Sequence, residues 1–150
     1  MCVAVCSTIC HPCSKSMLIL ASQSPRRSEL LRREGVDFTV VVKDTEEERD
    51  ATLAPQVLCA RNAAAKAEAV AVDYPQATVL GADTLGIFDG TPLGKPAHEA
   101  EALRWRTQLQ GRTHCVCTAV AVIMPGGERR EFAEISYVTF RSLSEADLRR

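Results

Sequence analysis

Short apolar runs alternate along the chain with longer segments of mixed polarity. The runs at 17–22, 38–42 and 77–82 have the length of buried strands. The run at 114–124 is apolar on both alternating faces, as expected of a central strand covered on both sides. A last strand is predicted at about 130–140, so the pattern places five main strands along the chain.

The segments between these runs have helical signatures. A helix over 25–34 would begin with Ser24 as its N-cap and Pro25 at its first helical position. Further helices are predicted over the alanine-rich segment 55–74 and over 98–109. Strands that alternate with helices in this way predict an α/β fold of three layers, in which helices flank a mixed sheet.

Size and charge limit the class of protein. The chain has 150 residues, of which 46% are hydrophobic and 25% charged, which suits one globular domain. A net charge of −1 argues against a protein that holds nucleic acid by bulk electrostatics. No apolar run approaches the roughly twenty residues of a membrane helix. We therefore expect a soluble protein without a nucleic-acid or membrane partner.

The seven cysteines are unevenly distributed, and four of them lie near the N-terminus: Cys2, Cys6, Cys10 and Cys13. The odd count and the absence of a convincing secretory signal favour free thiols in a reducing cytoplasm. The stretch 6–13 includes His11 and could supply four zinc ligands, but it matches no usual ligand spacing. A simpler interpretation makes Met17 the natural start, with 1–16 a disordered or mis-assigned extension of a domain over 17–150.

The first strand leads into a cluster of hydroxyls and cations that is suited to an anion. Ser22 and Ser24 are followed by Arg26 and Arg27 at the predicted start of a helix. Free N–H groups and the positive end of the helix dipole lie there, and guanidinium groups bind phosphate in bidentate fashion. The plainer alternative is that two exposed arginines follow an ordinary helix cap.

Acidic residues form a second set of candidates. Asp83 follows a buried strand and precedes an Asp-Gly hairpin, a strand-end position where α/β folds carry their chemistry. Alternatively, it only caps a turn through its own side chain. Lys66 and Lys95 could converge with the arginines on a polyphosphate, opposite carboxylates able to hold Mg²⁺. The chain has neither a P-loop nor a dinucleotide-binding glycine motif.

Six motifs, in this order, resemble the Maf family of nucleoside triphosphate pyrophosphatases. They are Ala21-Ser22-Gln23-Ser24-Pro25-Arg26-Arg27, Asp44-Thr45-Glu46-Glu47, Lys66-Ala67, Gly81-Ala82-Asp83-Thr84, Leu93-Gly94-Lys95-Pro96 and Gly111-Arg112-Thr113-His114. The resemblance implies a mixed α/β fold with a nucleotide cleft, similar to inosine triphosphate pyrophosphatases. It also implies cleavage of a nucleoside triphosphate to the monophosphate and pyrophosphate with a divalent metal, Mg²⁺ or Mn²⁺.

The resemblance also implies roles for individual residues. Asp83 corresponds to the general base or metal-linked acid, and Glu47 to a second acidic group near the metal. Thr84 after Asp83 points to the branch that acts on dTTP and UTP in nucleotide-pool housecleaning, whereas the 7-methyl-GTP branch usually has glutamine there. The groups expected to bind the substrate are Ser22, Ser24, Arg26, Arg27, Lys66, Thr84 and Lys95.

The C-terminal end leaves one alternative open. Ser144 resembles an N-cap, with Asp147 three residues later, and family members continue past this helix into a segment that contributes to the site. We therefore expect a C-terminally truncated domain. A non-catalytic nucleotide-binding or division-regulating protein is the alternative function, and a homodimer is the partner arrangement that the family suggests.

Overall fold

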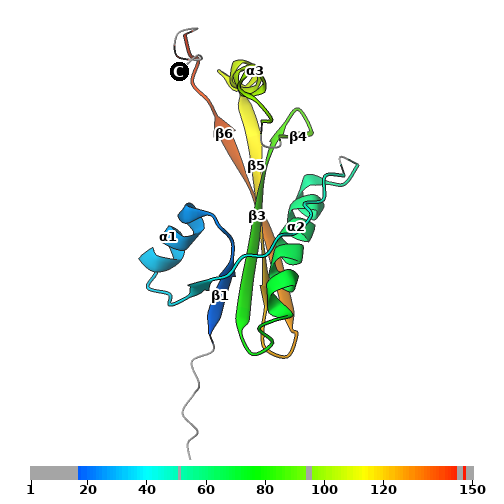
Figure 1. Cartoon of the computed structure of the whole chain (residues 1–150). Helices are drawn as coiled ribbons and strands as arrows, with labels where there is room; N and C mark the ends of the chain where they lie inside the picture. Colours follow the sequence, from blue (N-terminus) through cyan, green and yellow to red (C-terminus); the bar gives the residue numbers. More distant parts are fainter. Residues whose placement is uncertain (1–16, 51, 94–95, 145–146, 148–150) are drawn as a thin grey trace, which may run out of the picture.

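The computed structural model describes residues 17–50, 52–93, 96–144 and 147 and has the predicted mixed α/β class. Figure 1 shows a twisted sheet with α2 on one side and α1 on the other, beside β1. The elements are β1 (Leu18–Ala21), α1 (Pro25–Arg33), β2 (Thr39–Val40), α2 (Pro55–Ala71), β3 (Thr78–Phe88), β4 (Thr91–Leu93), α3 (Glu99–Leu109), β5 (Thr113–Ile123) and β6 (Arg129–Thr139).

The sheet has six strands in the described part of the chain, in the order β2-β1-β3-β5-β6, with β4 paired to β3. Strand β1 is parallel to β2 and to β3, which confirms the predicted β–α–β start. Strands β3, β5 and β6 form an antiparallel set of long strands, and β3 turns into β4 through Asp89 and Gly90, both with positive φ. The predicted hairpin is therefore confirmed.

Strand β3 differs from the prediction in one respect that concerns the site. The sequence suggested that a strand ends at Ala82, so that Asp83 would follow it. Instead, β3 continues through Asp83 to Phe88, because its antiparallel pairing with β5 extends without a break from Val79 to Ile87. Asp83 therefore lies in mid-strand, opposite Ala119, and not at a strand end.

Helix α1 starts and ends where the sequence predicted, but its first turn is satisfied differently. Ser24 is the N-cap residue, yet its side chain makes no capping hydrogen bond. Its backbone N–H instead donates to the hydroxyl of Ser22 at 3.3 Å. At the other end Gly35 has a φ of 70°, the left-handed conformation that glycine adopts readily at this position. The helix therefore ends within one residue of the predicted range.

The core lies between α2 and one face of the sheet. The helix approaches the sheet closely because its inner face is made of small residues, among them Ala63 and Ala67, both fully buried. Gly81 of β3 lies directly beneath them, and a Cβ at this position would be 2.3 Å from the carbonyl oxygen of Ala63. The fully buried large side chains are Ile19, Leu20, Leu58, Cys59, Val70, Val79 and Cys117.

The other face of the long strands is more open than the sequence predicted. The middle of β5 is buried toward α2, whereas on the opposite face His114 is buried but Val116, Val120 and Val122 are only half-buried. Phe132 of the neighbouring β6 is 61% exposed. Helix α3 has no buried residue and so does not cover this face. The prediction for β5 was thus wrong for one of its two faces.

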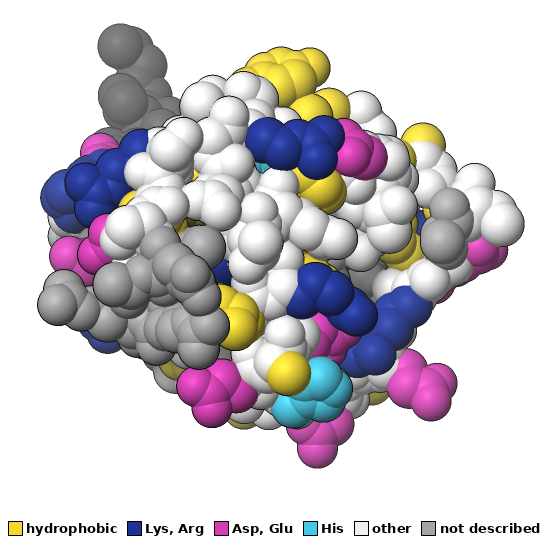
Figure 2. Space-filling view, turned by 90° about the horizontal axis from the view of Figure 1, so that it is seen from above, with side chains coloured by type: hydrophobic (Ala, Val, Ile, Leu, Met, Phe, Trp, Pro, Cys, Tyr) yellow, Lys and Arg dark blue, Asp and Glu magenta, His cyan; other side chains and the backbone are white. Residues whose placement is uncertain are grey.

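Three further features of the described residues complete the fold. Seen from above, basic and acidic side chains lie next to one another, so this end of the molecule carries mixed charge (Figure 2). Within the described ranges, no helix is both long enough and apolar enough to cross a bilayer. The predicted Ser144 cap is present, because its hydroxyl accepts a hydrogen bond from the N–H of Asp147 at 3.2 Å.

Candidate active site

The site lies where β1 and β3 separate. Their pairing ends at Ala21 and Gly81, after which the chain turns from β1 into α1. Beyond this point β3 continues with β5 as its partner, and the carbonyl of Ala82 accepts a hydrogen bond from Arg27 Nη1 at 3.0 Å. A side chain of α1 thus takes the place that a strand would otherwise fill.

Arg27 is held by two further hydrogen bonds. Its Nη1 donates to Ser22 Oγ at 2.8 Å, and its Nη2 donates to Thr84 Oγ1 at 3.1 Å. Burial lowers the pKa of the guanidinium, and the nearby Asp83 carboxylate partly offsets this effect. An arginine nevertheless stays charged at neutral pH. The structure therefore brings Ser22, Arg27 and Thr84 together around a fixed cation.

Thr118 of β5 supports this arrangement and was missed by the sequence analysis. Its hydroxyl lies 3.1 Å from Thr84 Oγ1, and the two residues are directly opposite in the β3–β5 register. A single threonine in an apolar strand was the available signal. Its partner could be identified only once the register of the two strands was known.

A second cluster lies on the α2 side of β3. Lys66 Nζ donates to Asp83 Oδ1 at 2.6 Å and to Glu47 Oε1 at 3.1 Å. The Asp83 side chain is 9% exposed, and Lys66 and Glu47 are 20% and 41% exposed. Burial alone would lower the pKa of Lys66, but the hydrogen bonds and charges of the two carboxylates outweigh it and raise the pKa. The sequence-predicted trio is thus joined by one ammonium group.

Asn62, also missed by the sequence analysis, fixes the loop that carries Glu47. We call residues 46–49 the acid loop. Asn62 is 4% exposed, accepts from the backbone N–H of Glu48 at 2.8 Å and donates to the carbonyl of the same residue at 3.1 Å. The loop borders an open hollow of about 520 Å³ lined by Glu46, Glu47, Glu48 and Arg49. Asn62 therefore holds the acid loop beside this hollow.

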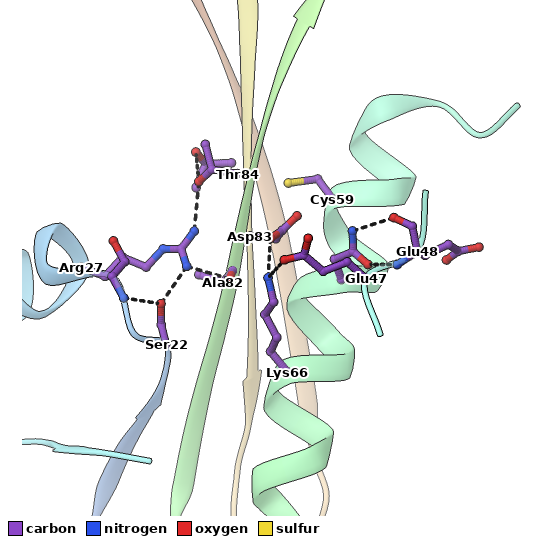
Figure 3. A network of polar contacts seen from close by, with 12 residues as sticks. Ser22, Arg27, Glu47, Glu48, Cys59, Lys66, Ala82, Asp83 and Thr84 are labelled. Atoms are coloured by element: carbon purple, nitrogen blue, oxygen red, sulfur yellow. Dashed lines mark hydrogen bonds and ion pairs between the residues drawn. The ribbon is translucent and has the colours of Figure 1, made fainter. Parts of the chain in front are cut away.

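The two clusters lie on opposite faces of β3, as Figure 3 shows. Successive side chains of a strand point to opposite faces, so Thr84 faces Arg27 while Asp83 faces Lys66. They are still neighbours electrostatically, because the charge of Asp83 acts on Arg27. We call Arg27 with Ser22 and Thr84 the cationic half of the site. We call Asp83 with Glu47 and Lys66 the carboxylate half. The backbone of β3 joins the two halves.

The remaining predicted site residues are less engaged. Ser24 contributes its backbone N–H to Ser22, and Arg26 is exposed on the first turn of α1. Lys95 lies outside the described residues, as do the proposed zinc ligands Cys6–Cys13 and the expected extension 1–16.

Cys59 of α2 lies against Asp83 but is not suited to nucleophilic chemistry. The residue is fully buried, and its Sγ donates to the carbonyl of Cys117 at 3.5 Å. Burial, followed by the charge of Asp83, raises the pKa of the thiol to about 12. The group is therefore a neutral thiol at physiological pH, and the thiolate that nucleophilic attack requires is scarce.

The carboxylate half fits a divalent cation that is shared with a substrate. No group of three or more His, Cys, Asp and Glu residues suited to a metal occurs among the described residues. Mg²⁺, however, typically takes one or two carboxylates and completes its shell with water and substrate phosphates. Glu47 and Asp83, which converge on one Lys66 ammonium, supply such a pair.

Comparison with known proteins identifies the family of this chain. The family model described as "Maf-like protein" matches residues 17–150, which include both halves of the site. The chain belongs to the Maf family.

Relatives of this Maf-family chain include several with named activities. It is 54% identical over 132 residues to a dTTP/UTP pyrophosphatase of Akkermansia muciniphila, and the matched segment covers 88% of this chain and 69% of the relative. A dTTP/UTP pyrophosphatase of Symbiobacterium thermophilum is 47% identical, covering 87% and 67%. A 7-methyl-GTP pyrophosphatase of Albidiferax ferrireducens is 41% identical, covering 87% and 66%.

Solved structures agree on the fold. The Ham1 protein of Staphylococcus aureus matches with a TM-score of 0.55 at 18% identity, over 81% of this chain and 70% of that one. A nucleoside-triphosphatase, dITP/XTP pyrophosphatase, of Mycobacterium abscessus matches with a TM-score of 0.51 at 20% identity, over 82% and 72%. The expected similarity to inosine triphosphate pyrophosphatases is therefore confirmed at the level of fold.

Proposed function

We propose that this Maf-family chain hydrolyses nucleoside triphosphates, dTTP and UTP in particular, to the monophosphate and pyrophosphate. The observation that carries the proposal is the Asp83–Lys66–Glu47 cluster next to the fixed Arg27 guanidinium. The same residues lie within the segments matched by relatives named dTTP/UTP pyrophosphatases. A cationic half that can bind phosphate, beside a carboxylate half, suits cleavage of a phosphoanhydride.

The cationic half would bind the phosphates. A guanidinium has five N–H donors, so the three hydrogen bonds of Arg27 to protein leave donors for a phosphate oxygen. Because those bonds fix the group before substrate arrives, little ordering is left for the binding step. Arg26 and the positive end of the α1 helix dipole would add positive potential.

The carboxylate half would activate water. Asp83 would orient a water molecule and take its proton as the water oxygen bonds to the α-phosphorus and the bond to the bridging oxygen breaks. The bridging oxygen leaves with pyrophosphate, and Lys66 would offset part of the negative charge that gathers there. Glu47 and Asp83 would hold Mg²⁺ or Mn²⁺, which when bound would neutralise phosphate charge.

Pyrophosphate release tests this proposal. The chain would be assayed with dTTP, UTP, GTP and 7-methyl-GTP in the presence of Mg²⁺ or Mn²⁺. We expect turnover of dTTP and UTP, and a loss of about 100-fold or more in Asp83→Asn. Asp73→Asn, an exposed change beyond the end of α2, is the matched control and should retain activity. Nucleotide binding without pyrophosphate release by the unaltered chain would instead support the non-catalytic alternative.

The setting of the reaction is a further part of the proposal. We place the chain in the cytoplasm, where it would remove unwanted pyrimidine nucleotides. The free thiols of Cys59, Cys115 and Cys117 support a reducing compartment. A homodimer stays a prediction that light scattering of the purified chain would measure.

A further inference from the structure

The Lys66 ammonium already binds one oxygen of each carboxylate that would hold a divalent cation. Its Nζ donates to Asp83 Oδ1 at 2.6 Å and to Glu47 Oε1 at 3.1 Å. An ammonium and a divalent cation that share these carboxylates would repel each other strongly at such distances. Full binding of the cation between Asp83 and Glu47 therefore requires Lys66 to move away.

The parts around the ammonium differ in how freely they can move. Asp83 is fixed in the middle of a strand, and the backbone of the acid loop is held by Asn62. Helix α2 is pressed against β3 at Gly81. Lysine, by contrast, carries its charge on a flexible four-carbon stem. The Lys66 side chain is 20% exposed beside the more exposed Glu47, so its ammonium is the part that can be displaced.

A triphosphate would provide the reason for displacement. Its oxygens are strong acceptors for an ammonium group, and they also complete the shell of a divalent cation. Arg27 cannot replace Lys66 between the carboxylates, because it lies on the other face of β3 and is held by three hydrogen bonds. Of these two cations, Lys66 alone can exchange its carboxylate partners for the phosphates of a nucleotide.

We propose that Lys66 competes with the divalent cation for Asp83 and Glu47, and that bound nucleotide relieves this competition by drawing the ammonium to its phosphates. Metal and nucleotide then bind with positive coupling, and each raises the affinity for the other by the same factor. This inference rests on the proposed function, since it takes the nucleotide and the metal from it. It adds that Lys66 limits metal binding while no nucleotide is bound.

Mn²⁺ binding, followed by electron paramagnetic resonance or calorimetry, tests the competition directly. In the chelator-treated chain, Lys66→Met should bind Mn²⁺ about tenfold tighter or more than the unaltered chain, because a competing positive charge is removed. Lys66→Gln serves as a second variant with a polar side chain. Lys43→Met, which alters a lysine paired with Asp73, is the control and should leave Mn²⁺ affinity unchanged.

The coupling is tested with the α,β-methylene analogue of dTTP, which resists cleavage between the α- and β-phosphates. The analogue should raise Mn²⁺ affinity in the unaltered chain by a larger factor than in Lys66→Met, where only direct contact of metal and phosphate remains. Equal or weaker Mn²⁺ binding by both Lys66 variants, or the same coupling factor in all chains, would overturn the inference. These outcomes do not depend on pyrophosphate release, whose absence would refute the proposed function separately.

Discussion

Replacing Gly81 by alanine should disturb both the fold and the site. An alanine Cβ at this position would lie 2.3 Å from Ala63 O, 2.7 Å from Ala67 N and 2.9 Å from Ala67 Cβ. Two of these atoms belong to the backbone of α2, so no side-chain rotation can relieve the contact. The helix or the strand must therefore move.

The size of the effect follows from these distances. Ordinary contact begins near 3.4 Å, so the shortest distance must grow by about 1.1 Å. Such overpacking typically lowers the free energy of unfolding by about 1–3 kcal/mol. Alanine offsets about 0.4–1 kcal/mol of this, because it gives the unfolded chain less conformational entropy than glycine does. We expect a net loss of about 1–2 kcal/mol in unfolding free energy. Lys66 precedes Ala67, and a displacement of about 1 Å at a reacting group can cost about 100-fold in rate.

Urea unfolding followed by circular dichroism, together with pyrophosphate release, measures both effects. Gly86→Ala is the matched control, because it makes the same change in the same strand and its Cβ would meet the Leu93 side chain at an ordinary 3.5 Å. If Gly81→Ala were as stable and as active as Gly86→Ala, the close approach of α2 to β3 would not be what positions Lys66.

Three further outcomes are expected from single changes. Asn62→Ala should lower the unfolding free energy by about 2 kcal/mol, because the part-buried backbone N–H and C=O of Glu48 both lose their partner. Faster hydrogen exchange confined to the acid loop would show it, and unchanged exchange would contradict it. Thr118→Val should raise the KM for dTTP a few-fold through a less fixed Thr84, whereas Thr118→Ser should restore it; equal KM values in all three chains would argue against this support. Cys59→Ala should flatten the decline of stability above pH 9. The pKa of the thiol is 9.0 in the unfolded chain and about 12 in the folded chain, so the folded chain holds more protons between these pH values. The free energy of unfolding therefore falls by up to about 4 kcal/mol as the pH rises through this window. Urea unfolding at pH 8 to about 11 would reveal equal slopes if the reasoning were wrong.

The elements could be predicted from local pattern, and much of the site could be predicted with them. Ser24, Pro25 and Gly35 mark the ends of α1 through backbone preferences that act within a few residues. The extent of β3 depends instead on β5, more than thirty residues later, which pairs past Asp83. A carboxylate expected at a strand end therefore lies in mid-strand.

The supporting residues of the site were beyond a reading of local sequence. Asn62 is an amide within an alanine-rich helix, and nothing nearby shows that it binds the backbone of Glu48, fourteen residues earlier. The role of Thr118 follows only from the β3–β5 register, which places it opposite Thr84. Charged motifs can be recognised by residue type, whereas the groups that orient them depend on tertiary pairing.

The separation of β1 and β3 at Gly81 also has a consequence for how activity is regained during refolding. Leu18 pairs with Thr78, and Arg27 reaches Thr84 and Ala82 only when this parallel pairing has formed. Contacts between residues so distant in sequence form late, because closing the intervening loop costs entropy before it is rewarded. Helix α2, which depends on local hydrogen bonds, can form much earlier. The helical circular dichroism signal should therefore recover before nucleotide binding does. The slowest refolding phase should be the one that forms the cationic half of the site.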